Sequence, residues 1–175
     1  MKARILCAQG LEECEALITY DLLYRAGIKV ELVGLQDVIT SSHNVTFNTH
    51  VNIDDFNYAE CDCLILPGGM PGTLNLENDE RVQKLIDYFV ENDKYIAAIC
   101  AAPSILAHKG LLKDGGFVCF PGHESGLKTA EGRACTDGKI ITGRGMGAGL
   151  HFSYEIIKAL IDEDKAKEVF AKIQY

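Results

Sequence analysis

The sequence predicts an α/β fold in which a mostly parallel sheet is covered by helices on both faces. Short apolar runs alternate along the chain with segments whose apolar residues recur at helical spacing. The runs are almost continuously apolar, as strands are when helices bury both of their faces. The length of 175 residues and the lack of any linker or repeat predict a single domain over residues 1–175.

The first part of the chain predicts a βαβ unit followed by a hairpin and a buried strand. Strand-like runs over 3–8 and 28–35 flank a helical segment that stops at Gly27, a residue type common at helix C-termini. The segment 38–54 is rich in β-branched residues around a polar centre, which predicts a hairpin excursion. The run 61–69 predicts a buried strand that ends in a Gly-Gly turn.

The second part of the chain continues the alternation. Asp79 precedes an amphipathic segment and is expected to be its N-cap. Parallel sheets of this kind place ligands at the carboxyl ends of their strands, so the loops after Ala8, Pro67 and Ile99 are expected to meet. The expected elements are a helix over 79–93, a strand over 95–99, a helix from about 101, a strand over 117–120, strands near 133–136 and 139–142, and helices over 147–161 and 163–173.

Charge and cysteine content argue against several classes of function. The 17 basic and 25 acidic residues give a net charge of −8 without a Lys/Arg run, so neither nucleic acid nor a membrane is an expected partner. No apolar stretch reaches the roughly 18 residues of a transmembrane helix, and the first apolar run is too short for a signal peptide. The odd count of seven cysteines predicts reduced thiols in a cytoplasmic protein. Cys61 and Cys63 lack the further ligands of a zinc site, so neither a metal nor a cofactor is expected.

Cys100 stands where the apolar run 95–99 ends and a small-residue helix is expected to begin. It is either a buried packing residue or a nucleophile on a strand-to-helix turn, as the serine is in a nucleophile elbow. Ala101 and Ala102 are small enough to let a helix pack closely on the sheet after a sharp turn. A helix N-terminus lowers a thiol pKa by about one unit, which would bring Cys100 near neutrality.

Two neighbouring strand ends supply groups that suit a nucleophile. The turn at 67–72, "PGGMPG", is either only a tight turn or, with the N–H of Ala101, an oxyanion hole of backbone amides. Glu12, Glu13 and Glu15 fall in a first helical turn, where carboxylates interact favourably with the helix dipole. Glu15 is also placed to face inward, where a carboxyl beside a thiolate would have a raised pKa, stay protonated and move protons near pH 7.

Five segments resemble the ThiJ/PfpI superfamily in residues and in order, and are most similar to the branch of the parkinsonism-associated protein deglycase, a glutathione-independent glyoxalase, and its bacterial relatives. They are "EECEA" (12–16), "LLYRAGIKV" (22–30), "LPGGMPG" (66–72), "AAICAAP" (97–103) and "GRGMGAG" (143–149). The resemblance implies a flavodoxin-like three-layer sandwich with a cysteine nucleophile elbow, usually assembled as a homodimer.

The resemblance also implies roles for individual residues. Cys100 is expected to be the reactive cysteine, Glu15 its protonated carboxyl partner, and Gly69 and Ala101 the amide donors. Asp21 and Arg25 match first-helix residues near the family's dimer interface, and the family's interface arginine in the hairpin is His43 here. Accessory roles near the site are expected for Gly68, Cys119, His123 and Arg144.

The sequence departs from some members of the family near the expected nucleophile. Phe120 stands where those members carry a histidine, and the nearest histidine in the chain, His123, follows three residues later. A Cys-His-carboxylate triad is therefore not expected, and a peptidase or amidotransferase is the least favoured function. His123 and Glu124 resemble the His-x-Glu of cysteine glutaminases only loosely.

Cys119 and Arg144 each have two interpretations. Cys119 is either a packing residue or a thiol that resolves an oxidised Cys100. The Gly-rich segment around Arg144 suggests a phosphate loop but lacks the Lys-Ser/Thr of a P-loop. A tight turn before a helix is preferred, with Arg144 holding the loops near the site.

The leading functional hypothesis is a cofactor-free cysteine enzyme acting on α-oxoaldehydes such as methylglyoxal, or on their adducts with proteins or nucleotides. Cys100 would form a hemithioacetal, Glu15 would shuttle the proton, and a 2-hydroxy acid would be released. The alternative is an oxidative-stress sensor or redox-regulated chaperone that works through oxidation of Cys100.

Overall fold

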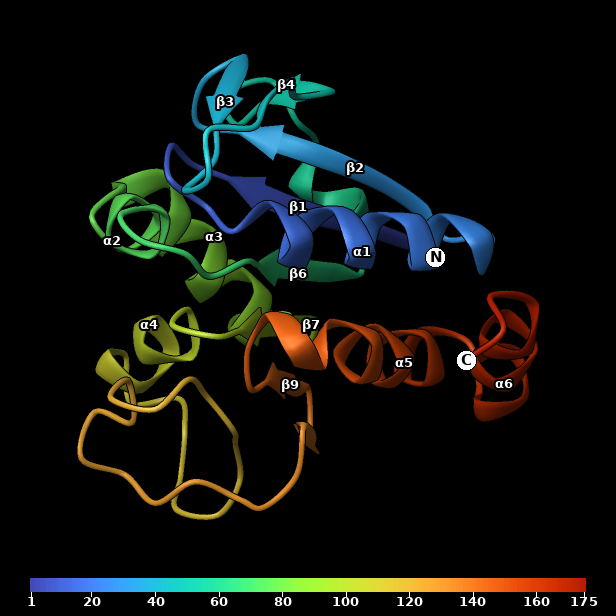
Figure 1. Cartoon of the computed structure of the whole chain (residues 1–175). Coiled ribbons are helices and arrows are strands. Elements are labelled where there is room, and N and C mark those ends of the chain that lie inside the picture. Colours follow the sequence, from blue (N-terminus) through green and yellow to red (C-terminus); the bar gives the residue numbers. More distant parts are fainter.

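The computed structural model describes residues 1–175, and its helices and strands alternate along most of the chain (Figure 1). The elements are β1 (Lys2–Cys7), α1 (Glu13–Arg25), β2 (Lys29–Gly34), β3 (Val38–Thr40), β4 (Thr46–Asn48), β5 (Val51–Asn52), the 3₁₀ turn η1 (Tyr58–Glu60), β6 (Cys63–Leu66), α2 (Gly72–Glu77), α3 (Glu80–Glu91), β7 (Tyr95–Ile99), α4 (Pro103–His108), β8 (Ala134–Asp137), β9 (Ile140–Gly143), the 3₁₀ turn η2 (Met146–Ala148), α5 (Gly149–Leu160) and α6 (Glu163–Lys172).

One seven-stranded sheet organises the molecule, with the strand order β5-β2-β1-β6-β7-β9-β8. Every neighbouring pair in it is parallel except β8 and β9, which form an antiparallel edge. Because all the parallel strands point the same way, their carboxyl ends lie along one edge, where parallel sheets bind ligands. The predicted α/β sandwich with a mostly parallel sheet is confirmed.

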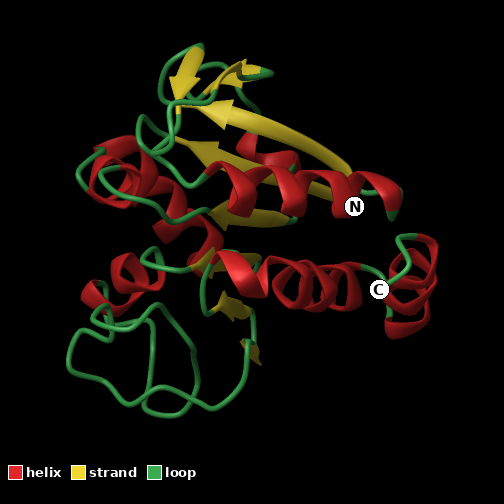
Figure 2. Cartoon of the chain, viewed as in Figure 1, coloured by secondary structure: helices red, strands yellow, loops and turns green.

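The residues of β1 alternate between two hydrophobic cores. Ala3 and Ile5 face a cluster built with α1, α5 and α6, whereas Leu6 faces a cluster built with α2, α3 and α4. Successive side chains of a strand point to opposite faces, so this alternation places helices on both sides of the sheet. Figure 2 shows the resulting layers of helix, sheet and helix. No helix is both long and apolar enough to cross a membrane.

Local sequence signals explain where the helices begin and end. The Asp79 carboxylate accepts a hydrogen bond from the N–H of Arg81, which confirms the predicted N-cap of α3. Gly27, with φ +81°, ends the turn after α1 in the left-handed conformation that glycine tolerates best. The sequence did not predict the short helix α2, because Gly and Pro residues surround its start.

The expected hairpin over 38–54 is only partly correct. Strands β3 and β4 form a two-stranded antiparallel sheet of their own, but β5 joins the main sheet beside β2 in parallel. The hairpin projects above the carboxyl end of the sheet (Figure 1). It therefore brings the polar loop between β3 and β4 close to the start of α1.

The prediction of a strand over 117–120 is wrong. β7 pairs instead with β9, so the edge of β7 is not open to this segment. Its N–H groups find scattered partners: Val118 donates to Oγ1 of Thr142 at 3.0 Å, and Phe120 donates to the carbonyl of Cys100 at 2.8 Å. The segment is thus an extended loop over the carboxyl end of the sheet.

Candidate active site

Cys100 lies on a sharp turn between β7 and α4. Its φ of +66° is in the left-handed region, which is rare for a residue other than glycine and costs about 1–3 kcal/mol. The backbone holds this turn from both sides, because the N–H of Cys100 donates to Gly143 at 2.9 Å and its carbonyl accepts from Phe120. A strained strand-to-helix turn is the geometry of a nucleophile elbow, as the sequence predicted.

The helix after the elbow begins later than expected. α4 starts at Pro103, whose ring favours the first helical position, and Ala101 and Ala102 form a buried turn before it. The Oγ of Ser104 donates to the carbonyl of Ala101 at 2.8 Å and helps to hold this turn. The sulfur of Cys100 therefore faces the turn before α4 rather than the first turn of the helix.

Glu15 reaches the sulfur from the first turn of α1. Its side chain is 1% exposed, and its Oε2 accepts a hydrogen bond of 2.8 Å from the N–H of Gly68. Its Oε1 is buried without any other hydrogen-bond partner, and the carboxyl interacts with the thiol of Cys100. The expectation that Glu15 faces inward is confirmed.

The glycine turn after β6 fits closely between these two groups. A Cβ on Gly68 would lie 2.6 Å from the Cβ of Cys100 and 2.8 Å from Oε2 of Glu15. Gly69 has φ +87°, and a Cβ there would lie 2.2 Å from the backbone nitrogen of Glu12. Glycine at both positions therefore lets the backbone amides approach the elbow.

Two backbone N–H groups lie against the sulfur. Those of Ala101 and Gly69 interact with the Cys100 thiol, and both act to lower its pKa. They come from the turns after β7 and β6, which are neighbours in the sheet. The pair can stabilise negative charge on the sulfur or on an adjacent oxygen, as oxyanion holes do.

Burial dominates the acid-base chemistry of the pair. It raises the pKa of Glu15 to about 7. Burial, and then the charge of Glu15 and the hydrogen bond to it, raise the pKa of Cys100 to about 12. The expected lowering of the thiol pKa by a helix end is therefore wrong, because the sulfur is enclosed beside a carboxyl and α4 starts only at Pro103. The coupled pair loses its first proton near pH 7 and holds the second, so it carries one negative charge once the pH rises above about 7.

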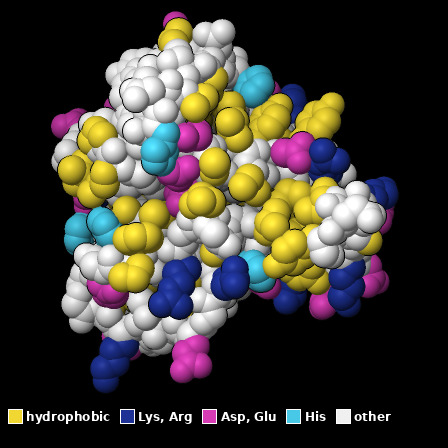
Figure 3. Space-filling model, in the orientation of Figure 1, with side chains coloured by type: hydrophobic (Ala, Val, Ile, Leu, Met, Phe, Trp, Pro, Cys, Tyr) yellow, Lys and Arg dark blue, Asp and Glu magenta, His cyan; other side chains and the backbone are white.

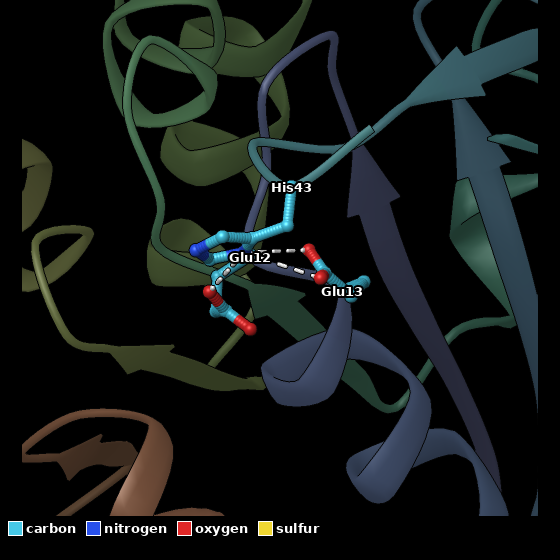
Figure 4. Close-up of side chains that lie close together, drawn as sticks. All are labelled: Glu12, Glu13 and His43. Carbon is cyan, nitrogen blue, oxygen red and sulfur yellow. Dashed lines mark hydrogen bonds and ion pairs between the residues drawn. The ribbon is translucent and has the colours of Figure 1, made fainter. Parts of the chain in front are cut away.

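A second ionisable cluster lies at the start of α1, next to the site. Figure 4 shows His43, from the loop between β3 and β4, pointing toward the carboxylates of Glu12 and Glu13. Its Nδ1 lies 3.3 Å from Oε2 of Glu12 and 3.1 Å from Oε1 of Glu13. The hydrogen bond to Glu13 and the charges of both carboxylates raise the pKa of His43. These three side chains are the group whose donor atoms lie close enough together to hold a metal ion.

The structure places the other predicted residues in less direct positions. Cys119 is buried and reduced, and burial raises its pKa to about 11. The ring of His123 packs edge-on against Phe120, and no histidine ring hydrogen-bonds Cys100. The guanidinium of Arg144 makes no hydrogen bond or ion pair within the chain, so the expected loop-holding contact is absent.

Two features of the site were not predicted from the sequence. The pairing of His43 with Glu12 depends on the hairpin folding back over α1, which no local pattern reveals. Arg133 lies beside Arg144, since the N–H of Arg144 donates to the carbonyl of Arg133 at 2.9 Å at the open end of the β8-β9 pair. The two predicted strands near 133–136 and 139–142 were a signal for this second contact, because an antiparallel pair brings its two outer ends together.

Comparison with known proteins gives consistent similarities. The DJ-1/PfpI family profile matches residues 1–159. The "Parkinson disease protein 7 homolog" of Danio rerio is 30% identical, with 98% of this chain and 96% of that protein covered. The "Protein DJ-1 homolog B" of Arabidopsis thaliana is also 30% identical over 96% of this chain, but the chain spans only 40% of that longer protein.

The fold comparison agrees with the sequence comparison. The structure of oxidized Toxoplasma gondii DJ-1 is similar with a TM-score of 0.92 and 29% sequence identity, covering 99% of this chain and 98% of that one. Sequence and fold thus match the same group of proteins over nearly the whole length, and the resemblance seen in the motifs is confirmed. The chain belongs to the DJ-1/PfpI family, in its DJ-1 branch.

Proposed function

We propose that this DJ-1-like protein is a cofactor-free cysteine enzyme that converts small α-oxoaldehydes such as methylglyoxal into 2-hydroxy acids, or removes their early adducts from proteins or nucleotides. The observation that supports it most strongly is the strained Cys100 elbow, whose sulfur faces a buried carboxyl and two backbone N–H groups. A fixed nucleophile, a proton acceptor with a pKa of about 7 and an amide pair are what addition to an aldehyde requires.

The first step is addition of the thiol to the aldehyde. As the sulfur of Cys100 bonds to the aldehyde carbon, its proton passes to the Glu15 carboxylate, and the aldehyde oxygen becomes an alkoxide. The N–H groups of Gly69 and Ala101 stabilise this oxygen, which then takes the proton from Glu15. The product is a hemithioacetal, and the pair ends the step with its original charge.

The second step moves hydrogen between the two carbons of the substrate. Glu15 removes the proton from the carbon bonded to sulfur, giving an enediolate. The hydroxyl proton on that carbon moves to the neighbouring oxygen, and Glu15 returns its proton to the neighbouring carbon. This internal oxidation and reduction leaves a thioester of a 2-hydroxy acid on Cys100. Water then hydrolyses the thioester, which regenerates the Cys100 thiol and releases the 2-hydroxy acid. When the substrate is methylglyoxal, this acid is lactate.

Turnover without glutathione tests the proposal. Purified protein is given methylglyoxal, and lactate is measured for the wild type, Cys100→Ser and Glu15→Gln. Cys135→Ser is the matched control, because Cys135 is a partly exposed thiol in β8, outside the site. We expect rapid lactate formation only from the wild type and the control, a rate lowered by about 10²–10⁴-fold from Glu15→Gln, and none above background from Cys100→Ser. Lactate formation by the wild type no faster than by Cys100→Ser would reject the enzymatic function.

A redox function is the second candidate, because the same groups suit an oxidised sulfur. Protonated Glu15 and the N–H groups of Gly69 and Ala101 are donors for the oxygens of a cysteine sulfinate. A hydroperoxide would oxidise Cys100 to the sulfinic acid in two steps, and each step would consume one peroxide. Intact-mass measurement after mild peroxide treatment tests this, and an unmodified Cys100 would exclude the sensor.

We also propose that the chain forms a homodimer through the α1 face. Leu17 and Tyr24 of α1 are exposed at 38% and 67%, and a groove beside them is lined by Ile18, Leu150 and Ile173 among other residues. Large exposed apolar side chains around a groove favour an interface. Size-exclusion chromatography with light scattering is expected to give twice the monomer mass, and Leu17→Glu to give the monomer.

A further inference from the structure

A cavity of about 550 Å³ lies beside the elbow and has no place in the chemistry described above. Its walls come from Phe120 and Pro121 on one side, Arg133 and Arg144 on another, and the turn from Gly145 to Ala148. Two of the lining residues are close to Cys100 through backbone hydrogen bonds. The N–H of Phe120 donates to the Cys100 carbonyl, and Arg144 directly follows Gly143, whose carbonyl accepts from the N–H of Cys100. The cavity is therefore tied to the elbow through the backbone of Cys100 on two sides.

The cavity has an uncompensated positive charge. The chain has five arginines, and three of them, Arg4, Arg25 and Arg81, form ion pairs with carboxylates. The other two are Arg133 and Arg144, and both line this cavity. In a chain with 25 acidic residues and a net charge of −8, two neighbouring unpaired arginines are unusual.

The hydrogen-bonding capacity of these two arginines is almost unused. Arg144 donates no side-chain hydrogen bond, and Arg133 donates one, of 3.2 Å, to the carbonyl of Gly147. No acidic side chain lines the cavity. Glu124 is near enough to Cys119 for its charge to raise the pKa of that thiol. Its carboxylate accepts a hydrogen bond from the N–H of Gly122 and forms no ion pair with either arginine. On the face shown in Figure 3, basic side chains lie below the centre, where Figure 1 has β9 and the start of α5.

The backbone adds to the positive potential. The turn η2 leads directly into α5, a helix of 12 residues whose first turn is not capped by any side chain. The N-terminal end of a helix carries a partial positive charge that favours an anion. Gly145 leaves the wall open, because a Cβ there would lie 3.3 Å from the ring of Phe120.

The other walls are apolar and accessible. Phe120 is 50% exposed and Met146 is 53% exposed. A ligand that fits such a cavity has a short carbon chain that contacts these two side chains and an anionic end that reaches the guanidinium groups. Arginine binds the planar or branched oxygens of carboxylates and phosphates through its fixed set of donors.

We propose that this cavity is an anion subsite, which selects substrates that carry a carboxylate or phosphate group on the chain attached to the α-oxoaldehyde. Arg144 and Arg133 bind the anionic group while the aldehyde carbon lies at Cys100. This inference rests on the proposed function for its substrate class, but the binding of an anion beside Cys100 can be tested without turnover.

The kinetic test compares neutral and anionic substrates. The probes are methylglyoxal, γ,δ-dioxovalerate with its carboxylate, and hydroxypyruvaldehyde phosphate. The wild type is expected to favour at least one anionic probe over methylglyoxal in kcat/KM, and the better anion identifies the preferred group. Arg144→Gln is expected to lose about tenfold or more on that probe, with methylglyoxal unchanged, because a charge-assisted hydrogen bond is removed.

Two further variants keep the kinetic test specific. Arg144→Lys retains the charge and is expected to recover part of the preference. Lys128→Gln removes one positive charge from an exposed position outside the cavity and is expected to leave the preference unchanged. An Arg144→Gln variant that lowers kcat/KM for neutral and anionic probes alike, or that keeps the wild-type preference, would overturn the subsite.

Alkylation of Cys100 tests anion binding without catalysis. Iodoacetate and iodoacetamide differ in charge but form the same bond to sulfur, and peptide mass mapping separates Cys100 from the other thiols. The ratio of the iodoacetate rate to the iodoacetamide rate is expected to fall severalfold in Arg144→Gln and to remain constant in Lys128→Gln. A fall in this rate ratio without any methylglyoxal turnover would support the subsite but reject the proposed function. A rate ratio that Arg144→Gln leaves unchanged would reject the subsite, whether or not the protein turns over methylglyoxal.

Discussion

The N–H of Gly68 donates a hydrogen bond of 2.8 Å to Oε2 of Glu15, and this bond joins the first turn of α1 to the loop after β6. It fixes one carboxyl oxygen and leaves the other buried beside Cys100 without a further partner. The geometry gives a single proton two alternative positions, on the carboxyl or on the sulfur.

The pH dependence of catalysis is expected to follow the pair. Loss of its first proton, with the pKa of Glu15 at about 7, creates the carboxylate that accepts the thiol proton. For methylglyoxal, kcat/KM is therefore expected to rise with pH through about 7 and then level off. Glu15→Gln removes the acceptor and is expected to lower kcat/KM by about 10²–10⁴-fold and to abolish this midpoint. A midpoint that persists in Glu15→Gln would assign the titration to another group.

Glu12 is expected to tune that midpoint from the neighbouring cluster. Its charge contributes to the raised pKa of Glu15, after burial, and His43 lies against Glu12. Glu12→Gln removes a negative charge and is expected to lower the midpoint pH of the kcat/KM profile. His43→Ala removes the imidazole that partly offsets the Glu12 charge and is expected to raise that midpoint. Shifts in the same direction for both variants would contradict this electrostatic coupling.

Folding stability is expected to fall as the pH rises. Glu15 ionises near its ordinary pKa of 4.5 in the unfolded chain but at about 7 in the folded protein. The folded state therefore holds a proton that the unfolded state has lost, and its stability decreases from below pH 4.5 to above pH 7, by about 3 kcal/mol. Urea unfolding at several pH values measures this loss, and the wild-type curve is expected to be steeper than that of Glu15→Gln. Parallel curves would show that Glu15 has an ordinary pKa in the fold.

Gly68→Ala tests the close fit of the glycine turn. Its Cβ would lie within 2.6 Å of the Cβ of Cys100, so the elbow or Glu15 must move. We expect a loss of kcat/KM of about 10²-fold, because small displacements of reacting groups are costly. Gly27→Ala is the control: it also strains a glycine turn but meets no atom within 4 Å, and is expected to lower stability while kcat/KM is retained.

The strain at the elbow can be measured by exchanging its residue. Cys100 has φ +66°, which glycine adopts freely and alanine does not. Cys100→Gly is expected to be about 1 kcal/mol more stable than Cys100→Ala in urea unfolding. At the neighbouring Ala101, where φ is not positive, glycine is expected to destabilise. Equal stabilities of the two Cys100 variants would indicate that the elbow stores no strain.

Much of the fold was predictable because local patterns and topology agree. Strand β7 and helices α3 and α5 lie within two residues of their expected bounds, since their apolar spacing, and for α3 also the Asp79 cap, are local properties. The convergence of the loops after β1, β6 and β7 followed from parallel strand order alone. The positions of Cys100 and Glu15 in the site followed from these loops.

Other features depended on contacts between distant parts of the chain. The segment 117–120 has the composition of a strand, but β9 occupies the edge it would need, so composition alone predicted it wrongly. The pairing of His43 with Glu12 and the meeting of Arg133 with Arg144 likewise depend on how separate segments are placed.

The sequence by itself determined the parallel sheet, because apolar runs alternate with segments of helical spacing along the chain. It also pointed to Cys100 and its carboxyl partner Glu15, through their place at strand ends together with the motifs that resemble a known family. Only the tertiary structure decided the chemistry of that pair. Burial raises the pKa of Cys100 to about 12, which reverses the expectation drawn from a helix end alone. The rise in the pKa of Glu15 to about 7 agrees with the expectation for an inward-facing carboxyl. The free-energy cost of ionising a buried side chain depends on how much water the surrounding fold excludes, and that exclusion is set by contacts between distant parts of the chain.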